Sequence, residues 1–480
     1  MPSAVAVVRR SGFLLDGGWV TQGTIAEIHS PFDQSTVSAV TLASRQQAEQ
    51  AVAAAVRAFE QTRRLPAFER QRILHAISQS ISQRHEELAR SICQEAGKPI
   101  KTARAEVDRA VFTFTIAAEE AGRIGGEFLP LDLQAFTAGR WGLVRRYPIG
   151  AIAAITPFNF PLNLVAHKIA PAIACGCTMV LKPAPQTPTP ALLLAEIVEK
   201  AGWPAGALNV LPLSNEDAAP LISDDRLAML TFTGSAPVGW QLKSKAGKKR
   251  VTLELGGNAG AIIHSDADLD HAAERCVTGG FSYAGQSCIS VQRILVQSSV
   301  YDKFLDKFLA GVAKLQTGDP MDATTDVGPL IRPSDAARVE SWIKEAVAAG
   351  AKLWCGGKRT GSLIEPTVLT HTTPTMKVNC EEVFAPVKTV EPYDDFRQAL
   401  ATVNDSPYGL QAGLFTRDAN LIFQAYDELQ VGGLIVGDVP TFRVDHMPYG
   451  GVKDSGLGRE GLRYSIEEMT ERKLLVMNLK

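Results

Sequence analysis

The sequence has 480 residues, of which 45% are hydrophobic and 21% are charged, as in ordinary water-soluble globular proteins. One hydrophobic core rarely serves so long a chain, so we expect two or three domains. The formal net charge of -2 argues against nucleic acid or an anionic membrane as a partner, because such partners usually require a basic surplus. The seven cysteines have no framework spacing, which indicates reduced thiols in a cytoplasmic protein.

The sequence indicates neither a targeting signal nor a membrane span. Residues 1–10 carry their arginines after a short apolar run, which is the wrong order for a secretory signal. No apolar run is long enough to cross a bilayer. Cys175 and Cys177 form the only tight cysteine pair, and two ligands without a second pair make a poor zinc site. We therefore expect no bound metal.

The first third of the chain is expected to be largely helical on a small base of strands. Short apolar runs and an Asp-Gly-Gly turn between residues 12 and 37 indicate strands. Helical patterns follow at 47–61, 68–96 and 101–121.

The segment 137–147 has a different character. Trp141 lies there among Arg140, Arg145 and Arg146, and glycines interrupt the run. The pattern is typical of an exposed ribbon, and a docking edge and a solvated hairpin fit it equally well.

From residue 150 onward, apolar strands alternate with helices. The strands are expected at 151–155, 178–181, 207–210, 229–232, 250–255 and 294–296, and the helices at 163–175, 190–201, 216–222, 238–246, 267–283, 300–315 and 335–349. Continuous apolar strands between helices are typical of a parallel sheet covered on both faces. The expected fold is α/β, with a doubly wound parallel sheet and a second α/β domain.

The loop around Cys288 is the candidate centre of the chemistry. It reads Gly285-Gln286-Ser287-Cys288-Ile289-Ser290 and precedes an apolar strand. A polar, flexible loop can present one thiol to a substrate, although a free cysteine is more often a small buried hydrophobe.

Two further candidates follow expected strands, where open α/β sheets place their ligands. Asn159 stands between two prolines that fix its backbone, so its amide could donate a hydrogen bond to an oxyanion; a helix cap is the alternative. Lys182 could reach ribose hydroxyls or a phosphate, or lie on the surface.

Ser235 follows a strand and a glycine turn at a helix start, a position that suits a phosphate as well as an ordinary capped turn. The Gly456-x-Gly458-x-x-Gly461 match is rejected as a dinucleotide fingerprint, because no apolar strand precedes it. Glu254, at a strand end before two glycines, is a candidate general base or an ion-paired glutamate. Glu382 could bind ribose hydroxyls or belong to an exposed acidic turn.

Taken in order, these motifs resemble the NAD(P)-dependent aldehyde dehydrogenase superfamily from about residue 12 to the C-terminus. The set comprises Pro-Phe-Asn159-Phe-Pro, Lys182-Pro183, Phe-Thr-Gly-Ser235, Leu-Glu254-Leu-Gly-Gly, Gly-Gln-x-Cys288, Glu382-x-Phe384-x-Pro386 and Pro448-Tyr449-Gly-Gly-x-Lys453-x-Ser455-Gly456. Each motif alone is weak, whereas the ordered set is specific.

The resemblance implies oxidation of an aldehyde to a carboxylic acid. Cys288 would attack the aldehyde, Asn159 and the Cys288 backbone N–H would bind the oxyanion, hydride would pass to NAD(P)+, and Glu254 would activate water against the thioester. The implied cofactor-binding residues are Thr156, Pro157, Phe158, Lys182, Pro185, Gly234, Ser235, Glu382 and Phe384. An acylating enzyme that uses coenzyme A and a non-catalytic binding or structural protein are the alternatives.

The resemblance also implies a domain plan. Residues 1–124 and 149–256 would bind the cofactor, 257–447 would form the catalytic domain, 448–466 a return segment, and 125–148 with 467–480 an oligomerisation ribbon. The last strand, 473–479, would pair across subunits of a homodimer or homotetramer.

Several positions depart from common family patterns and bear on specificity. Ser287 replaces an arginine found before the nucleophile in some relatives that act on phosphorylated aldehydes, and Gly437 stands where asparagine is common. The weak substrate candidates are Arg109, Phe160, Ser287, Ile289, Arg443 and His446, of which the charged ones could meet an anionic substrate or be solvated loop residues. Pro185 stands where many NAD-preferring relatives have a glutamate, so we expect NADP to be accepted at least as well as NAD.

Overall fold

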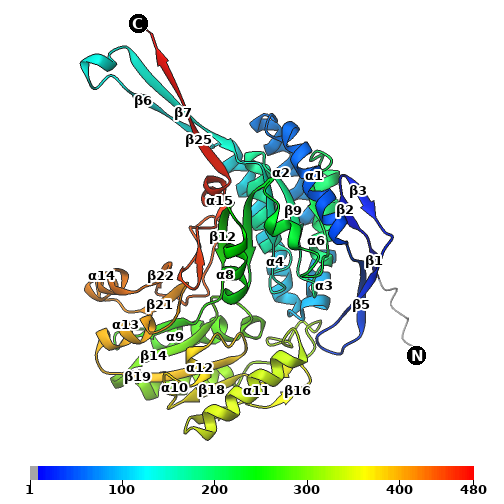
Figure 1. The fold of residues 1–480 in the computed structure, drawn as a ribbon. Coiled ribbons are helices and arrows are strands. Elements are labelled where there is room, and N and C mark those ends of the chain that lie inside the picture. The colour runs from blue at the N-terminus through cyan, green and yellow to red at the C-terminus, as the bar shows by residue number, and fades with distance from the viewer. Residues whose placement is uncertain (1–8, 480) are drawn as a thin grey trace.

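The computed structural model describes residues 9–479, so most of the 1–10 segment lies outside the described residues. The chain forms two α/β lobes, one above the other in Figure 1, and a long antiparallel ribbon that projects from the first lobe. Among the described residues, no helix has the length and apolarity that a membrane crossing requires.

The first lobe is built on an eight-stranded sheet whose central strands are parallel. In spatial order the strands are β24 (Gly456–Leu457), β12 (Arg250–Glu254), β11 (Leu227–Thr233), β8 (Ala151–Ile155), β9 (Thr178–Lys182), β10 (Leu208–Val210), β2 (Phe13–Leu15) and β3 (Gly18–Val20). The central strands are almost wholly buried, which explains their uninterrupted apolar sequences. Strands β1 (Arg9–Ser11), β5 (Thr36–Thr41) and β4 (Ile25–His29) form a small sheet beside this lobe.

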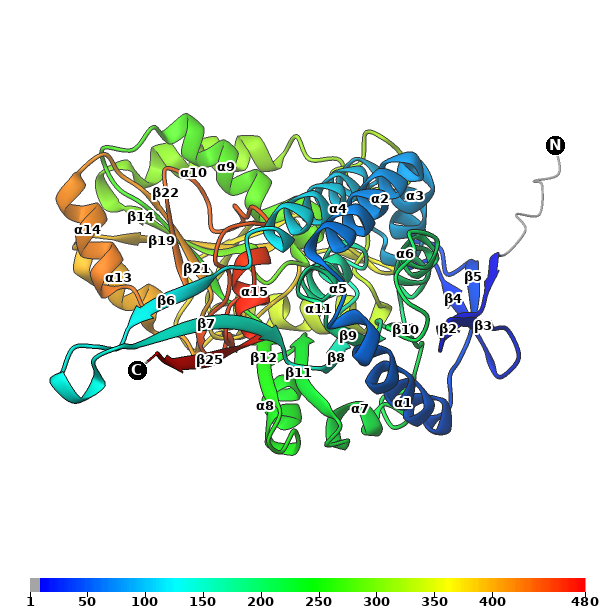
Figure 2. The ribbon, with the colours of Figure 1, turned by 90° about the horizontal axis from the view of Figure 1, so that it is seen from above.

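Helices cover both faces of this sheet, as expected for a doubly wound fold (Figure 2). One face carries α5 (Asn163–Cys175) and α6 (Thr189–Lys200), behind which pack α2 (Ala67–Gln83), α3 (His85–Ala96) and α4 (Ile100–Ala121). The other face carries α1 (Arg45–Thr62), α7 (Ala219–Ser223) and α8 (Ala236–Lys245).

The expected single helix over 68–96 is wrong, because the structure breaks it at Arg84 between α2 and α3. No glycine or proline marks the break. Instead, the Arg84 guanidinium donates to Glu87 at 2.7 Å and to Glu196 of α6 at 3.1 Å. A tertiary ion pair therefore accompanies a bend that local sequence did not indicate.

The second lobe has a seven-stranded sheet, also mainly parallel. Its order is β15 (Lys352–Cys355), β18 (Thr367–Thr370), β19 (Val387–Tyr393), β14 (Val291–Gln297), β13 (Ala259–Ile263), β21 (Gln411–Phe415) and β22 (Gly433–Val436). Helices α9 (Leu269–Phe281), α10 (Tyr301–Val312) and α11 (Pro333–Ala348) share one hydrophobic core with the sheet, and α13 (Phe396–Asn404) and α14 (Ala419–Glu428) share another.

The ribbon consists of β6 (Gly126–Pro130), β7 (Arg140–Pro148) and β25 (Thr470–Asn478), with β7 in the middle. It joins residues more than 300 positions apart and carries the chain's C-terminal strand (Figure 1). Trp141 is only half-exposed, because it packs on Phe128 of β6 with ring centroids 5.4 Å apart. Other apolar side chains of the ribbon are more exposed than Trp141, and three of them lie on β25.

Candidate active site

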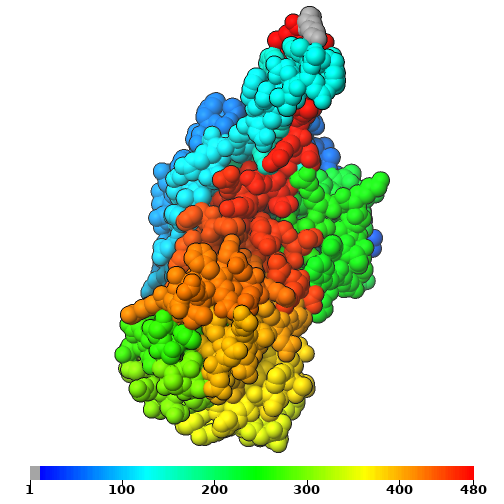
Figure 3. Space-filling model, turned by 90° about the vertical axis from the view of Figure 1, so that its left-hand side faces the viewer, coloured from blue at the N-terminus to red at the C-terminus, as the bar shows by residue number. Residues whose placement is uncertain are grey.

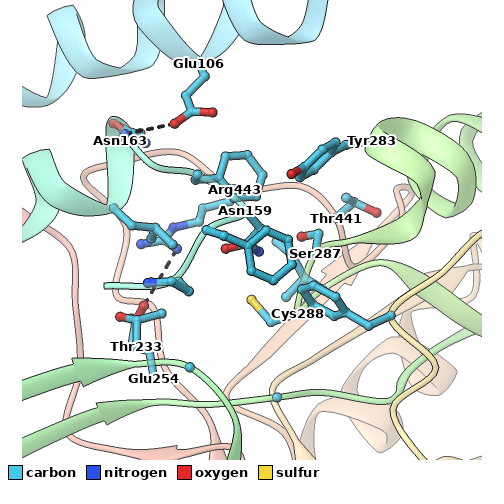
Figure 4. Close-up of a pocket in the computed structure, with 18 of the residues that line it drawn as sticks. Glu106, Asn159, Asn163, Thr233, Glu254, Tyr283, Ser287, Cys288, Thr441 and Arg443 are labelled. Carbon is cyan, nitrogen blue, oxygen red and sulfur yellow. Dashed lines mark hydrogen bonds and ion pairs between the residues drawn. The ribbon is translucent and has the colours of Figure 1, made fainter. Parts of the chain in front are cut away.

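A cavity of about 490 Å³ lies where the two lobes meet. Its walls come from α4, the loop after β8, the ends of β11 and β12, the loop 282–290, the segment before β19 and the loop 437–451 (Figure 4). In chain order these segments are far apart, and only the carboxyl ends of β8, β11 and β12 share one sheet edge. This edge is where open α/β sheets bind their ligands.

The loop 282–290, here named the thiol loop, has unusual backbone geometry. Tyr283, Ala284 and Gly285 have successive φ values of 50°, 53° and 71°. A Cβ at Gly285 would lie 2.3 Å from the Ala385 carbonyl oxygen, so only glycine fits there. Left-handed conformations at Tyr283 and Ala284 are costly and are found mainly at functional sites. The strained turn positions Cys288.

The sulfur atom of Cys288 lies near the centre of the cavity (Figure 4). The thiol is half-buried and lies 3.0 Å from the Tyr449 hydroxyl. Burial raises the pKa of Cys288 above its ordinary value; the Tyr449 hydrogen bond and the Arg443 charge oppose this effect, and Glu254 and Glu382 add to it. Cys288 is therefore a thiol at rest in the protein alone.

Asn159 follows β8 and is held against the thiol loop. Its Nδ2 donates to the Gln286 carbonyl at 3.0 Å, and its Oδ1 is buried without a partner among the described residues. Gln286 is itself tied to the second lobe through Pro329 and Ile331. The amide is thus fixed beside Cys288, with its second N–H available for an oxygen of a ligand.

Glu254, the last residue of β12, faces Cys288 from the first lobe (Figure 4). Its Oε1 is buried without a partner among the described residues, and its Oε2 lies 4.0 Å from Arg443. Burial, followed by the neighbouring charge of Glu460, raises the pKa of Glu254 well above its ordinary value. A carboxyl group with a raised pKa is suited to exchanging protons near neutral pH.

A buried cluster of charges supports this part of the cavity. Arg443 donates to Glu460 Oε2 at 3.3 Å and to His167 Nδ1 at 3.2 Å, and Lys168 donates to Glu460. His167 Nε2 lies 2.7 Å from Asp445 Oδ1 and His167 Nδ1 lies 3.6 Å from Glu460 Oε2, so the imidazole is held between two carboxylates.

Asp445 extends the cluster to α4. It accepts from Arg109 Nη2 at 2.6 Å and from Asn163 Nδ2 at 3.2 Å. Although burial raises the pKa of Asp445, hydrogen bonds and charges from His167 and Arg109 lower it far below its ordinary value. Asp445 is therefore ionised and holds Arg109 at the cavity wall.

Five of the six substrate candidates line the cavity. Arg109, Phe160, Ser287, Ile289 and Arg443 all do so. His446 is exposed and packs edge-on against Phe112, with ring centroids 5.9 Å apart, outside the lining. The structure thus brings together all but one of them.

Polar groups at the other end of the cavity and just beyond its lining are suited to a dinucleotide. Thr156 Oγ1 and Thr233 Oγ1 are buried without partners among the described residues. Burial alone lowers the pKa of Lys182 to about 8. Ser235 stands at the N-terminus of α8 but does not cap it with its side chain, so the hydroxyl and the helix N–H groups can bind a phosphate.

Glu382 and Phe384 line the cavity at its cofactor end. The Glu382 carboxylate accepts from the Gly257 N–H at 2.9 Å, and a Cβ at Gly256 would come within 2.3 Å of it. Burial raises the pKa of Glu382 to about 7. Phe384, with φ 53°, meets Phe158 edge-on at 6.0 Å. Pro157, Phe158 and Gly234 also line the cavity, whereas Thr156, Lys182 and the exposed Pro185 lie beyond its lining.

Sequence reasoning assigned no role to several of the polar groups at the substrate end. They are Glu106, His167, Lys168, Tyr283, Tyr449, Asp445 and Glu460. A signal was present on α5, because His167 and Lys168 interrupt a helix of which all 13 residues are buried. Buried charged residues require partners, and these come from distant segments that the local sequence does not reveal.

Comparison with known proteins agrees with this geometry. The sequence profile described as "Aldehyde dehydrogenase family" matches residues 19–475. The 3-sulfolactaldehyde dehydrogenase of Priestia megaterium is 45% identical over 478 residues, which are 99% of this chain and 100% of that protein.

Two solved structures are also similar. Aldehyde dehydrogenase 21 of Physcomitrella patens, in complex with its reaction product succinate, matches with a TM-score of 0.97 at 44% identity and covers 98% of both chains. The glyceraldehyde-3-phosphate dehydrogenase of Methanocaldococcus jannaschii, complexed with NADP, matches with a TM-score of 0.92 at 38% identity and covers 96% of this chain and 100% of that one. The chain therefore belongs to the aldehyde dehydrogenase family and is an NAD(P)-dependent enzyme that oxidises an aldehyde to a carboxylic acid.

Proposed function

We propose that the substrate is a short aldehyde that carries an anionic group, bound by Arg109 and Arg443, and that Cys288 is the nucleophile. The proposal rests on the placement of both arginines in the same cavity as the thiol. Residues 1–124 and 149–256 would supply the cofactor domain, 257–447 the catalytic domain and 448–466 the return segment.

The chemistry follows from the groups around the sulfur. The Cys288 thiolate attacks the aldehyde carbon, and the carbonyl oxygen takes up the negative charge. The Asn159 amide and the Cys288 backbone N–H bind that oxyanion, each contributing about 3 kcal/mol as in comparable sites. The nicotinamide ring, when bound, accepts the hydride. In its ionised form Glu254 then takes a proton from water as the water attacks the thioester, which releases the acid, and the leaving sulfur takes up a proton to restore the thiol.

The charge balance at the substrate end favours an anion. Its cations are Lys98, Arg109, Lys168 and Arg443, and its carboxyl groups are Glu106, Glu254, Asp445 and Glu460. Burial favours the protonated form of Glu254 at rest, so the four cations face three ionised carboxylates, and His167 adds no negative charge. An anionic substrate group would compensate the excess positive charge in an enclosed site, where Coulomb interactions are strong.

Both arginines have donors left for a ligand. Arg109 directs Nε and Nη2 at Asp445, which leaves Nη1 without a partner among the described residues, and its side chain is 31% exposed. Arg443 Nε is buried without a partner there. Guanidinium groups bind carboxylate, sulfonate and phosphate oxygens in a defined geometry.

The names of the similar proteins are consistent with this proposal. They refer to a sulfonated aldehyde, to succinate and to a phosphorylated aldehyde, and all three molecules are anionic. The shared feature supports an anionic substrate here.

The test compares anionic and neutral aldehydes of similar length. Arg109→Met should lower kcat/KM for an anionic aldehyde by about 100-fold, because losing a charge-assisted contact costs about 3 kcal/mol, while propanal oxidation changes less than about threefold. Arg104→Met is the matched control, because Arg104 lies on the same helix and pairs with Glu86 outside the cavity. An equal loss for both kinds of aldehyde would contradict the proposal.

We also propose that NADP is accepted at least as well as NAD. Pro185 offers no carboxylate to repel a 2′-phosphate, and Lys182 has no acidic neighbour that affects its pKa. Two like charges about 4 Å apart repel by about 4 kcal/mol at an effective dielectric constant of about 20. Isothermal titration calorimetry should therefore show that Pro185→Glu weakens NADP binding more than NAD binding. A parent enzyme with strong NAD preference, unaffected by this substitution, would refute the proposal.

Assembly and location are proposed on separate grounds. The exposed apolar strand β25 supports a homodimer or homotetramer that pairs through the ribbon, formed by 125–148 and 467–480. The seven unpaired cysteines support a cytoplasmic location.

A further inference from the structure

The Tyr449 hydroxyl is the one side-chain group within the described residues that makes a hydrogen bond to the Cys288 sulfur. Tyr449 is 2% exposed, and its ring packs with Ile289 and Leu410. Its backbone is fixed on both sides, because its N–H donates to the Glu460 carbonyl at 3.0 Å and its carbonyl accepts from the Glu460 N–H at 2.6 Å. Both the ring and the backbone therefore hold the hydroxyl in one place.

The direction of this hydrogen bond depends on the state of the sulfur. A thiol and a phenol can each donate to the other, but a thiolate can only accept. The phenol must therefore be the donor whenever Cys288 is ionised. Hydrogen bonds to an ionised acceptor are about twice as strong as those between neutral groups, so the contact favours the thiolate.

Arg443 strengthens Tyr449 as a donor. Its guanidinium lies 3.6 Å from the centroid of the Tyr449 ring, in cation–π contact. A positive charge on the ring face withdraws electron density from the phenol and makes its O–H more acidic. Arg443 thus acts on the sulfur both directly by its charge and through Tyr449.

The other charged groups around the sulfur come from several elements and act in opposite directions. Glu254 of β12 and Glu382 before β19 disfavour the thiolate, whereas Arg443 of the loop 437–451 favours it. Arg109 and Glu106 of α4, Arg338 of α11 and Glu460 lie farther along the cavity or behind it. Tyr449 and Arg443 are thus the two side chains that oppose burial at Cys288.

We propose that Tyr449 is a positioning residue for the nucleophile, which donates its hydroxyl proton in a hydrogen bond to the Cys288 thiolate and directs the sulfur toward the substrate. The proposal rests on the proposed role of Cys288. On ionisation the thiol proton leaves to water, and Tyr449 keeps its own proton. When the sulfur forms its bond to the aldehyde carbon it becomes a neutral thioether, which is a poor acceptor.

This asymmetry has a measurable consequence. Tyr449 stabilises the free thiolate more than the adduct, so it increases the thiolate fraction and lowers the reactivity of each thiolate. Removing the hydroxyl should therefore reduce the reaction rate at neutral pH and leave it equal or faster at high pH. A residue with only a packing role would change the rate equally at every pH.

The experiment measures alkylation of Cys288 by iodoacetamide against pH, with peptide mass spectrometry to follow this cysteine alone. Tyr449→Phe should raise the midpoint by about one pH unit, which lowers the rate near pH 7 about tenfold and leaves the plateau unchanged or higher. The matched control is Tyr301→Phe on α10, whose hydroxyl bonds the Val390 carbonyl at 3.1 Å away from the cavity. An unmoved midpoint, or a lower plateau without a shift, would overturn the proposal.

A second variant tests the same idea in the opposite direction. Replacing Tyr449 with 3-fluorotyrosine keeps the volume almost unchanged and makes the phenol a stronger donor, so the midpoint should fall. A midpoint that rises or stays constant would count against the proposal even if Tyr449→Phe does not fold. The role of Cys288 is tested separately. If Cys288→Ala still oxidises aldehydes, Cys288 is not the nucleophile, whereas the alkylation results for the parent and the Tyr449 variants remain valid.

Discussion

At the scale of single residues, different surroundings give two carboxyl groups of the active site, Glu254 and Glu460, opposite pKa shifts. The raised pKa of Glu254 keeps that carboxyl protonated at rest, whereas Lys168, His167 and Arg443 lower the pKa of Glu460 despite its burial and keep it ionised. Two adjacent carboxyl groups thus carry one proton between them, and the proton belongs to the one that faces the cavity. To act as a general base Glu254 must first lose this proton, and its raised pKa then gives the carboxylate a useful affinity for the proton of water near neutral pH.

Glu254→Gln should separate acylation from hydrolysis. If Glu254 activates water, the variant should keep its first burst of reduced cofactor and lose steady turnover by about 100-fold or more, as for other general bases. In the parent, steady turnover should rise with pH as Glu254 ionises, well above its ordinary pKa, and the variant should lose this rise. Stopped-flow absorbance measures both phases, with the exposed Glu381→Gln as control. An equal loss of burst and turnover would place Glu254 in thiol activation instead.

At the scale of elements, local sequence predicted most helices and strands. The expected helix at 163–175 coincides with α5, and the expected strand at 151–155 with β8. These elements have strong periodicity or uninterrupted apolar runs, and their ends are marked by glycine or proline. The failures occurred where tertiary contacts decide the outcome, such as the bend at Arg84 and the partners of Lys168.

The candidate site was predictable to a similar extent. Cys288, Asn159 and Glu254 lie in motifs that recur together, and the structure brings all three to one cavity. The Tyr449 contact to the sulfur and the ion pairs of Asp445 could not be predicted, because each joins segments more than 100 residues apart. Periodicity identifies the elements, whereas side-chain partners depend on how those elements pack.

Burial of Glu382, in the segment before β19, makes the stability of the cofactor-free protein depend on pH. Glu382 has a pKa of about 7 in the folded protein against an ordinary value of 4.5, because burial disfavours its charge. Below pH 4.5 both folded and unfolded chains are protonated, so there is no penalty. Between pH 4.5 and 7 only the unfolded chain ionises, so stability falls as the pH rises, and above pH 7 the penalty stays constant.

Glu382→Gln should therefore stabilise the cofactor-free protein at pH 8 and have little effect at pH 4.5. The difference between the two pKa values corresponds to at most about 3.4 kcal/mol, a figure that solvent screening reduces. Differential scanning fluorimetry at both pH values gives the change in melting temperature. Glu381→Gln is the matched control, because that neighbour is exposed. The same change in melting temperature at both pH values would exclude burial of the charge as the cause.

At the scale of the whole molecule, the ribbon is difficult to explain for a single chain. It extends beyond the body of the first lobe, and the space-filling view shows both its arms and the C-terminal strand projecting together (Figure 3). Leu474, Leu475 and Val476 of β25 are each about half-exposed, at 52%, 53% and 48%. The outer edge of β25 pairs with no other strand of the described chain. An exposed apolar edge strand is an aggregation hazard unless another surface covers it.

We expect a second copy of the chain to cover it. Each apolar side chain buried on assembly contributes about 1.5–3 kcal/mol, and a lysine in its place would leave an ammonium group to desolvate. Leu474→Lys and Leu475→Lys point to opposite faces of the strand, so comparing them identifies the face that is covered. The variant on the covered face should dissociate in sedimentation velocity experiments at micromolar concentration, and Lys473→Gln on the same strand should not. A parent that sediments only as a 51.6 kDa species would contradict this assembly.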